Sequence, residues 1–159
     1  MCGIIGYVGD RPCYELIVRG LERLEYRGYD SAGFALLDAD NDRYALVRAV
    51  GKLEDLRAAT VGADGLEGPT TGIGHTRWAT HGKVTLPNAH PHVSNDGRVA
   101  VVMNGIIENY VELRRRLQDE GVVFASETDT EVLPHLLARH YEGDIVAAVQ
   151  AVLPQLSGH

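Results

Sequence analysis

The residues best suited to chemistry stand at the start of the chain, where Cys2 directly follows the initiator methionine. Aminopeptidases generally remove a methionine that precedes a small residue, and Cys2 then becomes the N-terminus. A free thiol has a pKa near 8.5 and an α-amine one of roughly 7.7 to 8.0, so the amine can accept the thiol proton. One residue would then supply both a nucleophile and its base. Without further support, Cys2 is more typical of a small apolar residue at the start of a buried strand.

Four other segments carry polar and charged side chains of the types that amide hydrolysis needs. They are residues 24–33, 74–82, 104–110 and 126–131. Hydrolysis of a side-chain amide requires a nucleophile, a proton carrier, donors for an oxyanion, and anchors for the α-amino acid group. Taken singly, Arg77 is typical of a surface ion pair, Asp129 of a helix terminus and Asn104-Gly105 of a turn. Trp78 alone is typical of a core anchor.

Together with Cys2-Gly3-Ile4-Ile5-Gly6, these segments closely resemble the glutaminase domain of glutamine:fructose-6-phosphate amidotransferases, which are class II glutamine amidotransferases. The resemblance covers the whole chain. It implies one glutamine amidotransferase domain over residues 1–159, without the sugar-isomerase domain of those enzymes. It also implies an α+β fold, the four-layer αββα fold of N-terminal-nucleophile hydrolases, incomplete at the C-terminus. We therefore expect apolar surface and strand edges to stay uncovered, and the chain to self-associate or to be poorly stable.

The resemblance implies a role for each candidate site residue. Cys2 attacks the side-chain amide of L-glutamine, forms a glutamyl thioester and releases ammonia. The side-chain amide of Asn104 and the backbone N–H of Gly105 stabilise the oxyanion. Arg77 holds the substrate α-carboxylate with its planar guanidinium, and Asp129 receives the α-ammonium. Further positions in the substrate site or directly behind it are Trp78, Thr80, His81 and Arg27.

The resemblance leaves alternatives open. Other class II amidotransferases with an N-terminal cysteine, such as the one that acts on phosphoribosyl pyrophosphate, share the nucleophile, although the string from Thr76 to Gly82 favours the hexosamine enzymes. The chain is also compatible with a glutamine-binding or regulatory module without turnover. Met103 stands where we expect the family to have histidine, which puts a polar role at that position in question. The enzymes that the chain resembles pass ammonia to fructose 6-phosphate. We expect no cofactor. A homo-oligomer is possible, and the sequence does not decide the oligomeric state.

Composition limits the other classes of protein. The 159 residues include 15 basic and 22 acidic ones, and no basic block exceeds the triplet Arg114–Arg116, so we expect no nucleic-acid partner. No apolar run is long enough to span a membrane and no secretion signal is present, which predicts a cytoplasmic protein. The two cysteines predict no disulfide, and the spacing of His90-Pro91-His92 does not favour a metal site. The acidic loop 38–42 lacks the glycine and glutamate of a calcium loop.

Hydrophobic periodicity predicts the elements that position these segments. Strands are expected at residues 4–8, 34–37, 44–50, 73–79, 98–103 and 122–125. Helices are expected from Asp10 to Leu24, over 53–59, from an Asn109 cap to Gly121, after a capping box at 128–131, and over 145–156. Cys13 falls on the apolar face of the first helix and is expected in the core. Six strands grouped with five helices indicate largely antiparallel sheets.

Overall fold

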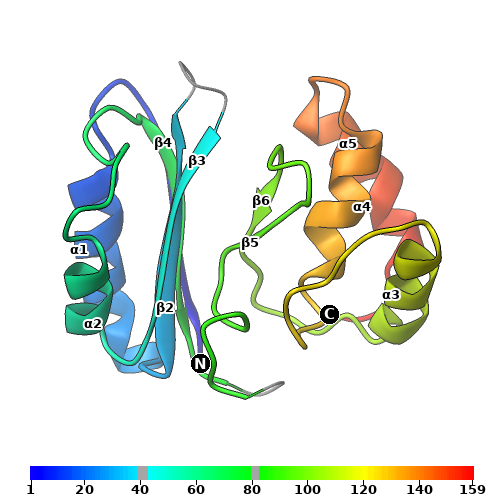
Figure 1. Ribbon diagram of the computed structural model, residues 1–159, viewed down its shortest axis with the longest axis horizontal. Coiled ribbons are helices and arrows are strands. Elements are labelled where there is room, and N and C mark those ends of the chain that lie inside the picture. Colours follow the sequence, from blue (N-terminus) through cyan, green and yellow to red (C-terminus); the bar gives the residue numbers. More distant parts are fainter. Residues whose placement is uncertain (39–42, 80–82) are drawn as a thin grey trace.

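The computed structural model describes residues 1–38, 43–79 and 83–159, which form four layers (Figure 1). In chain order the elements are β1 (Gly3–Val8), α1 (Tyr14–Leu24), η1 (Glu25–Arg27), β2 (Ser31–Asp38), β3 (Arg43–Val50), α2 (Leu53–Ala59), β4 (Thr71–Arg77), β5 (His92–Val93), β6 (Ala100–Val101), α3 (Tyr110–Asp119), α4 (Val132–His140), α5 (Ile145–Val152) and η2 (Leu153–Gln155). Helices α1 and α2 cover one face of a sheet, β5 and β6 lie over its other face, and α3 to α5 form the outer layer on that side. This is the expected α+β arrangement of layers, with antiparallel sheets.

The larger sheet has the strand order β1-β4-β2-β3, and all its neighbours are antiparallel. Strand β2 is central and buried for most of its length, which fits its apolar sequence. Helix α1 packs against this sheet through Ile17, Val18 and Leu21, all fully buried. Cys13 lies in the same core, as expected, and burial raises the pKa of its thiol.

Strand β4 turns different chemistry toward each of its faces. Successive side chains of a strand point to opposite sides, so Gly72 and Gly74 share one face while His75 and Arg77 share the other. Helix α1 approaches the glycine face so closely that a Cβ on Gly74 would lie 2.8 Å from Cγ2 of Ile17. The polar pair is therefore directed between the two sheets, where both side chains are at most 5% exposed.

The second core joins the outer helices to the short strands. Its buried members include Val99, Leu113, Leu117, Val132 and Leu136. Asp144 caps α5, since its Oδ1 accepts hydrogen bonds from the N–H groups of Val146 (2.9 Å) and Ala147 (3.1 Å). Helix α3 ends before Gly121, which has a φ of +90°. The predicted glycine stop of this helix is confirmed.

Several element predictions agree closely with the structure. Helix α2 has the expected bounds, and β1, β2, β3 and β4 each overlap their predicted strand. The helix expected from Asp10 begins instead at Tyr14. Asn109 does sit at the N-cap of α3, but its side chain makes no cap bond there. It binds the chain end instead, because Nδ2 donates to the carbonyl of Gln155 (2.9 Å) and Oδ1 accepts from the N–H of Ser157 (2.9 Å).

The strand predicted at 122–125 is wrong. Both backbone polar groups of Val123 are hydrogen-bonded at 2.9 Å by the side-chain amide of Asn95, which replaces a partner strand. Conversely, the strand β5 was not predicted, and the strand expected at 98–103 is reduced to β6. Arg114, the first residue of the basic triplet, is half-buried: its guanidinium lies 4.4 Å from the centre of the Phe124 ring.

The capping box predicted at 128–131 is also wrong. Helix α4 starts at Val132 with Glu131 at its N-cap and no side-chain cap bond. The Glu131 carboxylate is engaged by the preceding loop, where it accepts from the N–H groups of Ala125 (2.8 Å) and Ser126 (2.7 Å). Pro134 falls in the first turn of α4, where its missing N–H disrupts no helical bond.

Residues 157–159 run alongside residues 106–108. The N–H of Ile106 donates to the His159 carbonyl at 2.7 Å, and the N–H of Glu108 to that of Ser157 at 2.7 Å. Helix α5 packs on α4 through Ala148 and Val152 but leaves other apolar side chains exposed, namely Ile145, Val146 and Val149. Among the described residues, no helix is long and apolar enough to cross a membrane.

Candidate active site

A cleft of about 550 Å³ opens where the N-terminus, the end of β4 and two loops of the opposite half meet. Its lining residues are Met1, Cys2, Arg27, His75, Arg77, Trp78, His90, Met103, Asn104, Gly105, Ile106, Thr128, Asp129 and Thr130. Seven of the nine candidate site residues of the sequence are among them. The other two, Thr80 and His81, lie outside the described residues. Segments more than 100 positions apart in the chain thus face one space.

Strand pairing brings Cys2 to this cleft. The antiparallel register of β1 and β4 pairs Gly3 with Thr76, so the next residues outward are Cys2 and Arg77. The Cys2 thiol lies against the backbone of Trp78, whose N–H donates to Sγ (3.2 Å) and whose carbonyl accepts from it (3.5 Å). The thiol is half-exposed and open to the cleft. Because Met1 is attached, the nitrogen of Cys2 is an amide here and has no basic lone pair.

Asn104 lies directly beside Cys2. Its side-chain Nδ2 donates to the backbone carbonyl of Cys2 at 3.1 Å, and its Oδ1 meets Nε2 of His75 at 2.9 Å. The next residue, Gly105, is exposed and lines the same cleft. A carbonyl carbon attacked by the thiol would therefore develop its oxyanion near an amide donor.

A cation and an anion are buried at the back of the cleft. Arg77 is 5% exposed, and its Nη1 donates to the Lys83 carbonyl at 3.2 Å. Burial lowers the pKa of Arg77, while the negative charges of Cys2, Asp30 and Asp129 oppose that effect. Asp129 is 7% exposed, and its Oδ2 accepts from the Ile107 N–H at 2.8 Å. Opposite charges in one cleft suit a zwitterionic amino acid.

Trp78 and Arg27 border the cleft differently. Trp78 is 43% exposed, and its ring meets that of Tyr29 edge to face at 5.4 Å, so it is not the core anchor that the isolated residue would predict. Gly28 lets the two segments touch, since a Cβ there would lie 2.7 Å from the backbone carbon of Arg77. Nε of Arg27 is buried without a hydrogen-bond partner among the described residues.

The sequence assigned no role in the site to the imidazoles beside the cleft, and it offered His90 and His92 only as a disfavoured metal site. His75 stacks on His90 at 4.3 Å between ring centres, and His90 meets His92 edge to face at 4.7 Å. Burial lowers the pKa of His75 and of His92 to about 4, and that of His90 well below its ordinary value. No group of metal-ligating side chains that could hold an ion is found in the part of the chain that is described. One signal could have revealed His75: it lies two positions before Arg77, hence on the same strand face.

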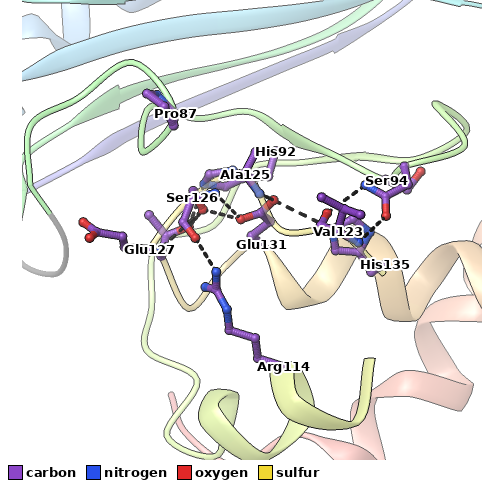
Figure 2. Close-up of polar contacts among 12 residues, drawn as sticks. Pro87, His92, Ser94, Arg114, Val123, Ala125, Ser126, Glu127, Glu131 and His135 are labelled. Atoms are coloured by element: carbon purple, nitrogen blue, oxygen red, sulfur yellow. Dashed lines mark hydrogen bonds and ion pairs between the residues drawn. The ribbon is translucent and has the colours of Figure 1, made fainter. Parts of the chain in front are cut away.

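A polar cluster around Glu131 shapes the loop that carries Asp129 (Figure 2). The Glu131 carboxylate also accepts from the Ser126 hydroxyl at 2.5 Å. Burial alone would raise the pKa of Glu131, but the nearby His135 imidazole, whose Nε2 lies 3.8 Å from Oε1, and hydrogen bonds from Ser126 and the loop backbone lower it to about 2. On the far side of the loop, Nη2 of Arg114 donates to the Ser126 carbonyl at 2.7 Å. The loop is thus held from both sides.

The sequence of this chain is similar to a known protein family and to several curated proteins. Residues 41–150 match the family model of a glutamine amidotransferase domain. Proteins called glutamine–fructose-6-phosphate aminotransferase [isomerizing] are similar to the whole chain: the one from Symbiobacterium thermophilum is 54% identical over 99% of the chain, and the one from Mycolicibacterium smegmatis is 52% identical over 100%. The chain spans about a quarter of the length of these curated relatives, 25% and 27% respectively.

Two solved structures share the fold. One is a glutamine phosphoribosylpyrophosphate amidotransferase from B. subtilis, with a TM-score of 0.77, 25% identity, and coverage of 99% of this chain and 33% of that one. The other is described as the allosteric regulatory enzyme of purine biosynthesis, with a TM-score of 0.81, 26% identity, and coverage of 99% and 34%. The layered fold predicted from the sequence is therefore confirmed as that of N-terminal-nucleophile amidotransferases.

Proposed function

Since this chain belongs to the family of glutamine amidotransferase domains, we propose that it hydrolyses the side-chain amide of L-glutamine, with Cys2 as the nucleophile. The observation that carries the proposal is the convergence of a thiol, an amide donor and a pair of opposite charges in one cleft. Arg77 binds the α-carboxylate of glutamine and Asp129 its α-ammonium, which leaves the side-chain amide to reach Cys2. A ligand without the α-amino acid group would leave both buried charges unpaired, and this gives selectivity.

The reaction begins when the α-amine of Cys2, freed by loss of Met1, takes the thiol proton. The sulfur attacks the amide carbon, a C–S bond forms, and the carbonyl electrons move to oxygen. The side-chain amide of Asn104 and the N–H of Gly105 stabilise this oxyanion. Its collapse breaks the C–N bond, and the nitrogen takes the proton back from the α-ammonium and leaves as ammonia. Water then hydrolyses the thioester to glutamate and restores the thiol.

For the complete protein we propose the reaction for which the relatives are named. Ammonia released at Cys2 would be used by a sugar-isomerase domain to convert fructose 6-phosphate into glucosamine 6-phosphate, with residues 1–159 as the glutaminase domain. The identity of 54% to such an enzyme, against 25% to the phosphoribosylpyrophosphate amidotransferase, supports this choice of acceptor. Trp78, Thr80 and His81 complete the substrate site in this proposal, and Arg27 lies behind it.

The test is to supply glutamine to Met1-free protein and to measure ammonia and glutamate together. We expect equal amounts of both products, and none from Cys2→Ala. Cys13→Ala is the matched control because Cys13 is the second of two cysteines and lies in the core, away from the cleft. If the wild-type protein bound glutamine in calorimetry but released no ammonia, the chain would be a glutamine-binding module and the hydrolase proposal would be wrong.

A further inference from the structure

We infer that His75 is a positioning residue that fixes the side-chain amide of Asn104 with its NH2 group facing Cys2. The inference rests on the proposed function, because it assigns Asn104 as an oxyanion donor. His75 itself lines the cleft from strand β4 and is 1% exposed. Its Nε2 lies 2.9 Å from Oδ1 of Asn104, and no other described side chain is hydrogen-bonded to that oxygen.

The orientation of Asn104 depends on which end of its amide meets which neighbour. The Cys2 carbonyl can only accept, so it favours the NH2 end, which lies 3.1 Å away. The amide oxygen then faces Nε2 of His75, which must carry a proton to donate. If Nε2 were unprotonated, that nitrogen would compete with the Cys2 carbonyl for the NH2 group, and the amide could rotate by half a turn. The tautomer of His75 therefore decides whether an oxyanion at Cys2 meets N–H or oxygen.

The surroundings of His75 favour the required tautomer. The ring is buried and stacked on His90, and Arg77 adds a positive charge nearby, so the imidazole is neutral and carries one proton. A weak hydrogen-bonding contact with the Met103 backbone raises the pKa of His75, yet no group among the described residues is placed to form a hydrogen bond with Nδ1. A proton on Nδ1 would be a buried, unpaired donor, which is rarer in proteins than an unpaired acceptor. The proton therefore resides on Nε2, where Asn104 receives it.

This arrangement acts on the transition state more than on substrate binding. Glutamine is held through its α-amino acid group at Arg77 and Asp129, whereas the Asn104 amide matters when negative charge develops on the attacked carbonyl. Loss of an oxyanion donor typically costs a hundredfold to a thousandfold in rate. A donor that is present but free to rotate should cost less, about tenfold to a hundredfold in kcat, with KM changed by less than about threefold.

The first experiment compares His75→Leu with His75→Gln in Met1-free protein. The glutamine side chain places an N–H close to the position of Nε2, so we expect it to retain most of the activity that leucine loses. The same substitutions are then made in an Asn104→Ala background. If His75 acts through Asn104, His75→Leu has little further effect there. Equal losses in both backgrounds, or loss of activity in His75→Gln equal to that in His75→Leu, would contradict the positioning role.

The second experiment does not depend on turnover and so separates this inference from the proposed function. Long-range ¹H–¹⁵N NMR spectra report which ring nitrogen of His75 is protonated, and ¹⁵N spectra report the side-chain NH2 of Asn104. We expect a proton on Nε2 between pH 6 and 8, and a changed Asn104 signal in His75→Leu but not in His75→Gln. A proton on Nδ1 would overturn the inference even in an active enzyme. The expected spectra in a protein without glutaminase activity would refute only the proposed function.

Discussion

At the scale of single residues, the reactivity of Cys2 depends on whether its backbone nitrogen is a free amine or is blocked by Met1. The Cys2 thiol is already placed by the backbone of Trp78, but its nitrogen is blocked by Met1, which is 76% exposed and lines the same cleft. A free α-amine at that nitrogen is the only base that the proposed mechanism uses. His75 and His90 are neutral and buried, and neither is hydrogen-bonded to Sγ among the described residues, so neither replaces it.

Removal of Met1 is therefore expected to increase the nucleophilic reactivity of the Cys2 thiol. Positioned proton transfer contributes typically a hundredfold to ten-thousandfold, and Met1 also occupies space beside the thiol. We expect protein without Met1 to be labelled at Cys2 by a glutamine-like electrophile, and Met1-bearing protein to be labelled at least about a hundredfold more slowly. Intact mass spectrometry of a mixture measures both forms in one sample. Equal labelling rates would exclude the α-amine as the base.

Arg77 is expected to recognise the substrate through the shape of its guanidinium. Arg77→Lys keeps the charge but cannot form two parallel hydrogen bonds to a carboxylate, so we expect glutamine affinity to fall by about tenfold or more. Calorimetry with Cys2→Ala protein measures binding without turnover. Arg19→Lys is the matched control, because Arg19 forms an exposed ion pair with Glu15 on α1. Unchanged affinity at equal stability would remove Arg77 from the binding site.

At the scale of elements, the carboxylate of Glu131 makes several of the hydrogen bonds that hold the loop before α4. Glu131 binds two consecutive backbone N–H groups and the Ser126 hydroxyl, which closes residues 125–131 into a tight loop (Figure 2). The loop in turn presents Asp129, whose Oδ2 binds the backbone of Ile107 in the segment that follows Asn104. The Asp129 carboxylate is thereby linked, through Ile107, to the segment that carries Asn104.

Glu131→Gln should lower stability and change its dependence on pH. The pKa of Glu131 is lowered from 4.5 to about 2, so its contribution is fully present above pH 4.5 and is lost as the pH falls toward 2. That shift corresponds to about 3 kcal/mol at neutral pH. We expect the free energy of unfolding of Glu131→Gln at pH 7 to be lower by about 2 to 3 kcal/mol and to vary less between pH 4.5 and 3.

Urea unfolding followed by circular dichroism at several pH values measures this effect. Asp96→Asn is a suitable comparison, since Asp96 also has a pKa lowered to about 2 but is 41% exposed and pairs with Arg98 at the surface. Solvent screens that pair, so its loss should cost much less. A pH profile of Glu131→Gln parallel to that of the wild type would show that the carboxylate is not the source of the acid sensitivity.

At the scale of the whole molecule, the two halves meet across a layer of neutral imidazoles. His75 comes from the larger sheet, whereas His90 lies just before strand β5 of the smaller sheet and His92 is the first residue of that strand. Around them lie the charged groups that act on their titration, Arg48, Arg77 and Glu131. Protonation of any ring would place a positive charge between the sheets, next to two arginines.

The folded protein should therefore lose stability steeply between pH 6.5 and about 4. Over that range the unfolded chain binds a proton at each of the three histidines, while the folded state does not, because burial lowers the pKa of His75 and His92 from 6.5 to about 4 and that of His90 well below 6.5. Each such proton contributes a slope of about 1.4 kcal/mol per pH unit. Unfolding measured at pH 5 and 6 should show uptake of two to three protons from these groups. His140→Gln, at an exposed position, should leave the slope unchanged, whereas His92→Gln should reduce it.

These 159 residues are expected to release ammonia but to form no amino sugar. The chain spans 25% of the length of the relative from Symbiobacterium thermophilum, and the cleft at Cys2 provides residues for the glutaminase step alone. Incubation with glutamine and fructose 6-phosphate, followed by chromatography of phosphorylated sugars, tests this directly. The full-length Aquifex aeolicus relative, 52% identical to this chain, serves as the positive control. Glucosamine 6-phosphate formed by the 159 residues alone would contradict the assignment of the second step to another domain.

The sequence by itself determined the elements whose signals are local. Apolar alternation and helical periodicity identified β1 to β4, α1 and α2, and ordered motifs picked out Cys2, Arg77, Asn104 and Asp129 before any contact was known. Only the tertiary structure decided how these segments meet. Val123 takes the side chain of Asn95 as its partner instead of a strand, Glu131 binds the preceding loop instead of capping a helix, and His75 faces Asn104. Each of these depends on hydrogen bonds between residues 5 to 29 positions apart in the chain, and satisfying buried polar groups is a property of the packed interior that no local pattern encodes.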